Sequence, residues 1–312
     1  MTEPVATSPL GPLHVSRVGL GCNNFGGRLD LGATRAVVDA ALDCGVTFFD
    51  TADIYGGRGG SERLLGEILE GRRDRVVLAT KFGMDMGDGV EARGTRQYAR
   101  SAVEASLRRL RTDRVDLLYY HRPDGTTPLA ETLRVLDELV REGKALAIGC
   151  SNLTVEQLDV AVRAAAEGGL APLSALQNEH SLLRREAEHD VLPRCRELGV
   201  GFVPYFPLAS GLLTGKYRRG QPPPPGTRLE HRPEALTHQA FTTIERLEAF
   251  ARDRGRTLLE LAIAGLASQP GVSSVIAGAT TPEQVRANAA AGSWQLDDED
   301  LRDLAALRPD AG

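Results

Sequence analysis

Short apolar runs recur along this 312-residue chain, and each run gives way to a polar residue or a turn. The run at 46–49 follows Gly45 and breaks into Asp50, a pattern typical of a strand that is buried on both faces. Runs of this kind, each predicted to form a strand, cover 15–20, 46–49, 76–80, 115–120, 145–148, 173–176, 200–203 and 274–276. Eight strands are therefore expected.

Segments with helical periodicity lie between these runs. One of them is 128–142, where Thr127 and Pro128 are expected to form the cap and the first turn. Residues 154–157 have the form of a capping box, and 281–283 has the Thr-Pro-Glu pattern of a helix start. The chain is thus predicted to alternate strands with helices.

Strands that alternate with helices pair in parallel through right-handed crossovers. Eight such units in 312 residues predict an α/β fold, a (β/α)8 TIM barrel in which 1–312 forms a single domain. A doubly wound sheet is the competing fold, but no Gly-x-Gly-x-x-Gly follows the first apolar run. The glycines at 56–60 have the wrong spacing for that motif, and we interpret them as a flexible loop.

Additions to the barrel are expected at four places. The turn-rich segment 9–13 predicts an N-terminal hairpin that plugs the bottom of the barrel. A long loop, 209–238, follows the seventh strand, and its prolines at 222–225 make it semi-rigid. Extra helices are expected at 239–253 and 296–307.

Composition narrows the class of protein. Hydrophobic residues make up 42% and charged residues 25% of the chain, as in ordinary globular proteins. The formal charge of -5 and the lack of a polybasic block argue against a nucleic-acid partner, and no apolar run approaches the ~18 residues of a membrane span. The four dispersed cysteines and the absence of a signal-like start predict a cytoplasmic protein with reduced thiols and no metal site.

Four chemically active side chains follow consecutive predicted strands. Asp50 and Tyr55 come after the second strand, Lys81 ends the third and His121 ends the fourth. Because the carboxyl ends of barrel strands surround one site, these side chains are expected to meet. Each also has a structural interpretation, namely a helix cap, a packed ring, a solvated charge and a structural imidazole.

Together the four residues suit the reduction of a carbonyl group. The Tyr55 hydroxyl is expected to donate a proton to the carbonyl oxygen, although an unperturbed tyrosine with a pKa of ~10 is a weak acid. The Lys81 ammonium would favour the phenolate and lower that pKa by ~1–3 units, with Asp50 holding the ammonium in place. His121 is expected to orient the carbonyl group.

Seven motifs carry a resemblance to the aldo-keto reductases, of the bacterial type related to potassium-channel beta subunits. The motifs are GLGC (19–22), DTADIYG (50–56), ATKFG (79–83), YHRPD (120–124), IGCSN (148–152), YFPLASGLLTGKY (205–217) and IAGATTPEQVRAN (276–288). The resemblance implies an NADPH-dependent oxidoreductase that turns an aldehyde or ketone, such as a sugar or a small xenobiotic carbonyl, into an alcohol. It implies Tyr55 as general acid, Lys81 and Asp50 as its tuning pair and His121 as the orienting residue.

The resemblance also implies where the cofactor binds. Ser151, Asn152 and Gln177 would hold the carboxamide, and Tyr205 would stack on the nicotinamide. Segment 207–216 would fold over the pyrophosphate. The full implied set is Gly21, Cys22, Ser151, Asn152, Gln177, Tyr205, Phe206, Pro207, Leu208, Ser210, Gly211, Lys216, Arg228, Gly278, Thr280, Gln284 and Asn288.

Departures from the family pattern leave the cofactor preference open between NADPH and NADH. Phe206 stands where serine is usual, and Ala287 replaces an acidic residue. Gly278 and Thr280 stand where many members carry Lys or Arg for the 2′-phosphate.

Three other functions stay open. They are a non-catalytic, cofactor-sensing regulatory subunit, an NAD-dependent sugar dehydrogenase that works in the oxidative direction, and a lyase that forms a Schiff base on Lys81. The physiological substrate and the choice between monomer and homo-oligomer are likewise not determined by the sequence.

Overall fold

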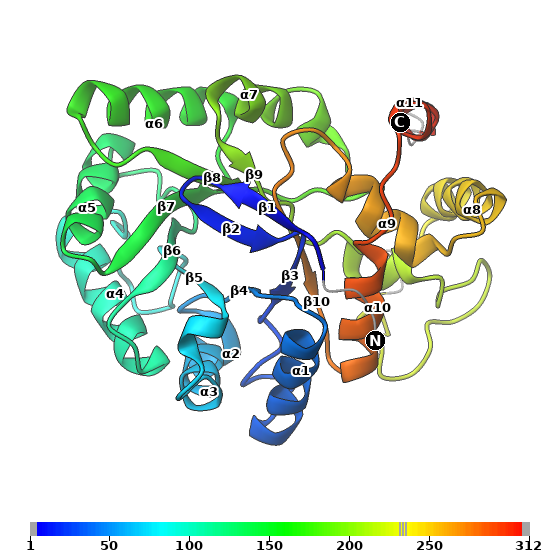
Figure 1. Ribbon diagram of the computed structural model, residues 1–312, viewed down its shortest axis with the longest axis horizontal. Coiled ribbons are helices and arrows are strands. Elements are labelled where there is room, and N and C mark those ends of the chain that lie inside the picture. Colours follow the sequence, from blue (N-terminus) through cyan, green and yellow to red (C-terminus); the bar gives the residue numbers. More distant parts are fainter. Residues whose placement is uncertain (1–4, 231, 233, 235, 308–312) are drawn as a thin grey trace.

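The computed structural model describes residues 5–307 except 231, 233 and 235. A sheet of eight parallel strands curls into a ring, and helices surround it (Figure 1). Around the ring the strands follow the order β10-β3-β4-β5-β6-β7-β8-β9. The strands of the ring are β3 (Val18–Gly21), β4 (Phe48–Asp50), β5 (Val77–Phe82), β6 (Val115–Tyr120), β7 (Ala145–Ser151), β8 (Leu173–Gln177), β9 (Gly201–Phe202) and β10 (Val275–Gly278).

Backbone hydrogen bonds close the ring between β9 and β10. The amide of Ser273 donates to the carbonyl oxygen of Phe202 at 2.9 Å, and the amide of Ile276 donates to that of Pro204 at 3.0 Å. The seventh predicted strand is shorter than expected, with only Gly201–Phe202 in β9. The expected (β/α)8 barrel is confirmed, and isolated bridges take the place of a longer seventh strand.

Helices alternate with the strands of the ring as the pattern predicts, and the last two follow the final strand, β10. They are α1 (Leu31–Asp43), α2 (Tyr55–Arg58), α3 (Gly60–Ile68), α4 (Arg96–Leu110), α5 (Leu129–Arg141), α6 (Val155–Gly168), α7 (Val191–Leu198), α8 (His238–Asp253), α9 (Leu258–Ala267), α10 (Pro282–Ala291) and α11 (Asp298–Ala306). Single 3₁₀ turns lie at Arg73–Arg75 and Glu186–Glu188, and two turns separated by a kink lie at Ala209–Thr214, where Ser210 and Gly211 have positive φ values. The expected extra helices are confirmed as α8 and α11.

Most of the predicted helix starts are confirmed, and one is wrong. Thr154 forms a complete capping box with Gln157, and Thr281 caps a helix whose first residue is Pro282. Helix α5, however, begins at Leu129 without a side-chain cap. The hydroxyl of Thr127 donates instead to Asp124 Oδ2 at 2.7 Å, which takes it away from the helix start.

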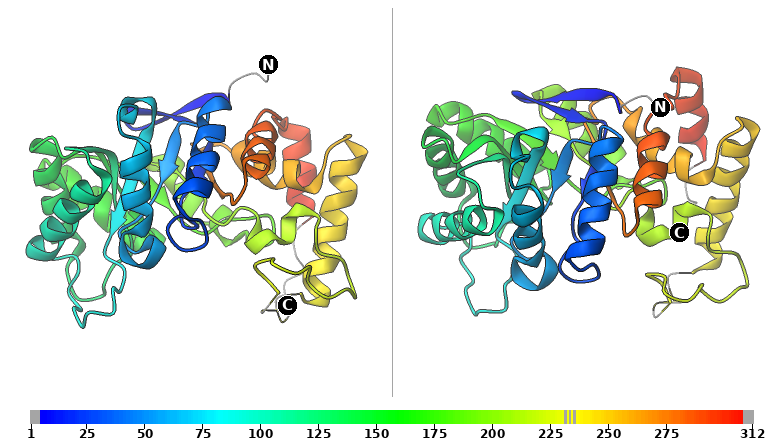
Figure 2. Two further views of the ribbon diagram at one scale, coloured as in Figure 1. Left: turned by 90° about the horizontal axis from the view of Figure 1, so that it is seen from below. Right: turned by 60° about the horizontal axis from the view of Figure 1, so that its bottom comes forward.

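The N-terminal hairpin closes one end of the barrel, as expected. Its strands are β1 (Thr7–Leu10) and β2 (Leu13–Ser16), which lie across the strand ring in Figure 1. Leu10, Leu13 and Val15 pack into the same apolar cluster as the inward-facing residues of the ring, for example Phe48 and Leu117. The hairpin therefore fills the amino-terminal end, and both views in Figure 2 show the long connections on the opposite face.

A larger apolar layer lies between the ring and its outer helices. Buried residues of α1, α4 and α5 pack there against the outward-facing residues of the strands. A separate cluster joins α8 and α9 to the Ala209–Thr214 turn, which follows β9. Within the part of the chain that the structure describes, no helix combines the length and apolarity that a membrane crossing requires.

Candidate active site

Asp50 and Lys81 form a buried ion pair at the carboxyl ends of β4 and β5. Lys81 Nζ lies 2.5 Å from Asp50 Oδ1, and the exposed fractions of the two side chains are 0% and 3%. Lys81 Nζ also donates to the Thr51 carbonyl oxygen at 2.9 Å, and Asp50 Oδ2 accepts from Gln177 Nε2 at 2.9 Å. The amine is thus held in place on more than one side.

Tyr55 begins α2, a four-residue turn whose next three residues have the positive φ values of left-handed backbone. Gly56 and Gly57 adopt positive φ values of 65° and 71°, and a Cβ on Gly56 would lie 2.4 Å from the Phe25 carbonyl oxygen. The segment 56–60 is not a plain loop as predicted, because α2 covers Tyr55–Arg58 and α3 already begins at Gly60. Its predicted flexibility stays a prediction. The turn gives the Tyr55 ring a defined position.

The Tyr55 ring lies between Lys81 and His121. Lys81 Nζ is 5.2 Å from the centre of the tyrosine ring. The His121 ring packs edge-on against Tyr55, with the ring centres 6.0 Å apart and an interplanar angle of 84°. All four of the side chains predicted to meet at the strand ends are thus brought together.

Burial and the neighbouring charges together set the protonation of Tyr55 and Lys81. Burial raises the pKa of Tyr55 above its ordinary value, and the Lys81 ammonium opposes this rise without reversing it. For Lys81, burial lowers the pKa, but Asp50 and Tyr55 outweigh that effect and raise it above its ordinary value. The resting site therefore holds a neutral phenol beside a charged amine. The lysine acts in the predicted direction, but the expected net lowering of the tyrosine pKa is not found.

His121 directly follows β6 and is 9% exposed. Its amide donates to the Phe82 carbonyl oxygen at 2.8 Å. Burial, followed by the charges of Lys81 and Arg122, lowers the pKa of His121 well below its ordinary value. The imidazole is therefore neutral at neutral pH, and its buried Nδ1 has no hydrogen-bond partner among the described residues.

A chain of hydrogen bonds surrounds this centre on the side of β7 and β8. Ser151 Oγ donates to the Gln177 carbonyl oxygen at 2.6 Å, and Asn152 Nδ2 donates to that of His121 at 3.0 Å. Tyr205 Oη donates to Asn152 Oδ1 at 2.8 Å. Asn152 adopts a positive φ of 61°, and its side chain connects the backbone carbonyl of His121 to the hydroxyl of Tyr205.

A cavity of about 450 Å³ lies at the carboxyl end of the barrel, where Phe206 and Gly278 line it, and Asp50, Tyr55, Lys81 and His121 are not among its lining residues. Of the residues expected to bind a cofactor, its lining contains Phe206, Pro207, Leu208, Ser210, Gly211, Lys216, Arg228, Gly278, Thr280, Gln284 and Asn288. Arg28 also lines the cavity, and no acidic side chain occurs among the described lining residues. The cavity is thus positively charged.

Six expected cofactor residues do not line this cavity. Ser151, Asn152, Gln177 and Tyr205 belong instead to the hydrogen-bonded chain around His121 and Asp50. The remaining two lie in the wall of the barrel. Cys22 is fully buried, and a Cβ on Gly21 would lie 3.1 Å from Ile276 Cγ2.

Comparison with known proteins decides the family. A model of the aldo/keto reductase family matches residues 17–309. This chain belongs to the aldo/keto reductase family. It is 35% identical over 303 residues to "Aldo-keto reductase YhdN" of Bacillus subtilis (strain 168), covering 94% of this chain and 89% of that protein.

Relatives of this aldo/keto reductase include proteins of two kinds. "Uncharacterized oxidoreductase YrpG" of Bacillus subtilis (strain 168) is 37% identical over 311 residues, covering 96% of this chain and 94% of that protein. "Probable voltage-gated potassium channel subunit beta" of Arabidopsis thaliana is 35% identical over 289 residues, covering 88% of this chain and 87% of that protein. The family and the relatives named as reductases or oxidoreductases support an oxidoreductase.

The cavity of this aldo/keto reductase contains residues that we did not select from the sequence. Asn23, Asn24 and Arg28 come from the connection between β3 and α1, and 225–227 comes from the long loop after β9. One signal was available, because Asn23 and Asn24 are polar residues directly after the first apolar run. Arg28 and 225–227 carry no such signal, since only the fold brings their two connections together.

Proposed function

We propose that this protein reduces the carbonyl group of an aldehyde or ketone to an alcohol, with NADPH as the reductant. When bound, the nicotinamide would supply the hydride for the carbonyl carbon. The observation that carries the proposal is a neutral phenol packed between a buried ammonium and a neutral imidazole, at the same end of the barrel as a cavity lined with cations. This set combines a proton donor with a site for an anionic cofactor.

Tyr55 is the proposed general acid. Because burial raises its pKa, the phenol keeps its proton until a carbonyl oxygen beside it gains negative charge. Lys81 then stabilises the phenolate that remains after the proton has been transferred. Positioned acids of this kind contribute roughly 10²–10⁴ in rate.

Asp50 and His121 act on this proton transfer in different ways. Asp50 holds the Lys81 amine at 2.5 Å and raises its pKa, so the amine keeps its charge. His121 is neutral and therefore adds no cation next to Lys81, so its ring is free to hydrogen-bond and orient the carbonyl oxygen.

The cavity residues suit a dinucleotide that carries several negative charges. Lys216 and Arg228 supply positive charge, and the amino terminus of α10 lies next to Thr280 and Gln284. A Cβ on Gly211 would lie 2.9 Å from Lys216 Nζ, so the glycine leaves room beside this cation. We propose that the pyrophosphate binds here.

The nicotinamide end would then lie against the hydrogen-bonded chain beside the tyrosine. We propose that Ser151, Asn152 and Gln177 hold its carboxamide and that Tyr205 stacks on its ring. Gly21 and Cys22 have no side chain or a small one, and we propose that this lets the cofactor lie close to the end of β3.

Steady-state reduction tests the proposal. Purified protein is mixed with NADPH and a panel of aldehydes, sugars and diketones, and the loss of NADPH absorbance is followed. We expect turnover in the wild type and a turnover lower by roughly 10²–10⁴ in Tyr55→Phe. Equal turnover in the two proteins would remove Tyr55 from the role of proton donor.

A cofactor-sensing regulatory subunit is the second candidate, since a relative named as a potassium channel subunit aligns over 88% of this chain. Such a protein would bind NADPH tightly and show no turnover with any substrate. Oxidation of a sugar with NAD⁺ at a higher rate than any reduction would instead favour the dehydrogenase direction. A Schiff-base lyase is opposed by the charged state of Lys81, because a nucleophilic amine must be neutral.

A further inference from the structure

Tyr119 is a second tyrosine beside Lys81, and the proposed reaction assigns no role to it. It lies on β6, and its side chain is completely buried. The centre of its ring is 5.8 Å from Lys81 Nζ, compared with 5.2 Å for the ring of Tyr55. The ammonium therefore lies near two phenol rings, of which only that of Tyr55 belongs to a residue that is partly exposed.

The register of the sheet fixes this arrangement. Tyr119 pairs with Lys81 on β5 and with Gly149 on β7, so the three residues face the same side of the sheet, the interior of the barrel. A Cβ on Gly149 would lie 2.6 Å from Cδ1 and from Cε1 of the Tyr119 ring. Glycine at position 149 thus leaves the space that one edge of the ring occupies.

Tyr119 lies at the boundary between the apolar interior of the barrel and the charged groups at its mouth. Its ring belongs to the apolar cluster that contains Leu10 of the hairpin and Leu117 of β6. The same ring lies near the Lys81–Asp50 pair, whose side chains are almost completely buried. A ring at this boundary excludes water from the ion pair on the side of the barrel interior.

The hydroxyl group does not explain why a tyrosine stands here. Its buried Oη atom has no hydrogen-bond partner among the described residues. Burial, followed by the charge of Asp50, raises the pKa of Tyr119 well above its ordinary value, although the nearby Gln177 amide opposes this rise, so the phenol is neutral at neutral pH. A buried polar group without a partner destabilises a protein. The ring is therefore the part of Tyr119 that acts on the site.

We propose that Tyr119 is a positioning residue, whose ring keeps the Lys81 ammonium next to Tyr55. The inference rests on the proposed function in that it takes Tyr55 as the proton donor. An ammonium is attracted to the face of an aromatic ring, and the attraction is stronger where water is excluded. Near two rings and Asp50, the amine has few alternative positions and stays where it stabilises the phenolate of Tyr55.

The pKa of Tyr55 reports the position of the ammonium without any turnover. It would be measured by NMR of protein labelled with 13Cζ-tyrosine, with the Tyr55 signal assigned by its absence from Tyr55→Phe. Tyr119→Leu removes the ring, so the ammonium should move away and the pKa of Tyr55 should rise by about one unit. Tyr119→Phe keeps the ring and should keep the wild-type pKa of Tyr55. Tyr119→Met, which fills more of the space without a ring, should behave like Tyr119→Leu.

Turnover gives a second measurement on the same variants. With NADPH and an aldehyde, kcat at neutral pH should fall by about tenfold in Tyr119→Leu, because one pKa unit is a factor of ten between phenol and phenolate. The KM for NADPH should not change, and Tyr119→Phe should retain most of the activity.

Tyr120→Leu is the matched control. Tyr120 is the next residue of β6 and equally buried, but its ring packs in the outer apolar layer against Phe82, with the ring centres 5.5 Å apart. This variant should lose stability without any change in the pKa of Tyr55. An unchanged Tyr55 pKa in Tyr119→Leu and Tyr119→Met would overturn the inference, as would an equal shift in Tyr119→Phe or in Tyr120→Leu. A wild type without turnover would overturn the proposed function, whereas the Tyr55 pKa would still test where Tyr119 holds the ammonium.

Discussion

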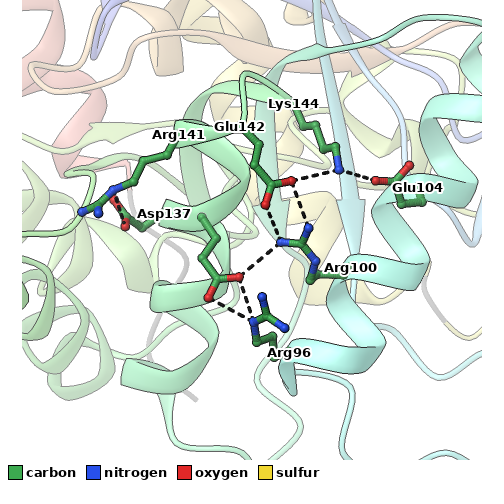
Figure 3. A network of polar contacts seen from close by, with 8 residues as sticks. Arg96, Arg100, Glu104, Asp137, Arg141, Glu142 and Lys144 are labelled. Atoms are coloured by element: carbon green, nitrogen blue, oxygen red, sulfur yellow. Dashed lines mark hydrogen bonds and ion pairs between the residues drawn. The ribbon is translucent and has the colours of Figure 1, made fainter.

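Two regions of this protein are rich in charged side chains, and they differ in how those charges are paired and in how far water reaches them. Between α4 and α5, arginine, lysine and glutamate side chains form a chain of ion pairs on the surface (Figure 3). Arg100 pairs there with both Glu138 and Glu142, and Lys144 pairs with Glu104 and Glu142. At the mouth of the barrel, by contrast, the Lys81–Asp50 pair is buried, and the cavity cations have no acidic residue among the described lining residues.

The contrast indicates what each region is for. In the surface network, charges of both signs are present and exposed to water, so the contribution of each pair to stability is small. At the mouth, the Lys81–Asp50 pair is shielded from water. The cations of the cavity have no acidic residue among the described lining residues. Charge that the chain does not neutralise itself is available to a ligand.

The largest expected effect concerns chemistry at the mouth. Tyr55→Phe should lower turnover by roughly 10²–10⁴ while NADPH affinity stays within about twofold, because only the proton donor is lost. Rates with the best aldehyde and calorimetric affinities would measure the two effects. Tyr98→Phe is the control, since Tyr98 Oη accepts from Arg93 on the connection after β5 and takes no part in the proposed proton transfer. A comparable loss in the control would contradict the assignment.

The next largest effect is on the free energy of unfolding, where one variant of the buried ion pair is compared with one of the surface network. Lys81→Met leaves Asp50 buried without its partner and should lower the free energy of unfolding by about 3–5 kcal/mol. Lys144→Met, the matched change in the network, should cost less than about 1 kcal/mol. Urea unfolding would measure both, and adding Asp50→Asn to Lys81→Met should recover part of the loss. Equal costs for the two lysines would mean that burial does not distinguish the regions.

Carboxyl groups in the two regions should give pH dependences of opposite sign. At the mouth, burial and then Glu62 raise the pKa of Asp53 from 3.8 to about 7. The folded state then binds this proton more tightly than the unfolded chain, so stability falls as the pH rises from about 4 to about 7. The loss is at most about 4 kcal/mol, because each pKa unit corresponds to about 1.4 kcal/mol.

Asp53→Asn tests this titration, because asparagine cannot ionise. The variant should remove most of the decline in unfolding free energy between pH 4 and pH 7. An unchanged pH profile would show that another group carries the dependence.

The smallest effect lies in the surface network. Hydrogen bonds from Arg100 and Lys144 lower the pKa of Glu142 from 4.5 to about 2, so the stability it provides is lost only as the pH falls through that range. Glu142→Gln should therefore cost less than about 1 kcal/mol at pH 7, and added salt should reduce the cost further. A large, salt-independent cost in urea unfolding would show that the network behaves like the buried pair.

Much of the barrel could be predicted from local patterns. Apolar runs mark buried strands, and Thr154 and Thr281 mark helix starts through side chains that bond only a few residues away. The start of α5 could not be predicted in this way. There Asp124 competes for the hydroxyl of Thr127, and that competition depends on how the preceding turn folds.

The sequence by itself determined which side chains gather at the mouth. Asp50, Tyr55, Lys81 and His121 end or follow neighbouring strands, and parallel strands bring their carboxyl ends to one place. The chemistry of the set follows from these residue types and this order.

Only the tertiary structure decided how those groups ionise and which charges meet. Burial depends on the whole fold, and it raises the pKa of Tyr55 above the value that Lys81 alone would favour. Likewise, Arg28 and Arg228 are 200 residues apart in number, and only closure of the barrel brings their guanidiniums to one cavity. Electrostatic interactions depend on distance in space and on access of water, and neither quantity is present in the order of residues.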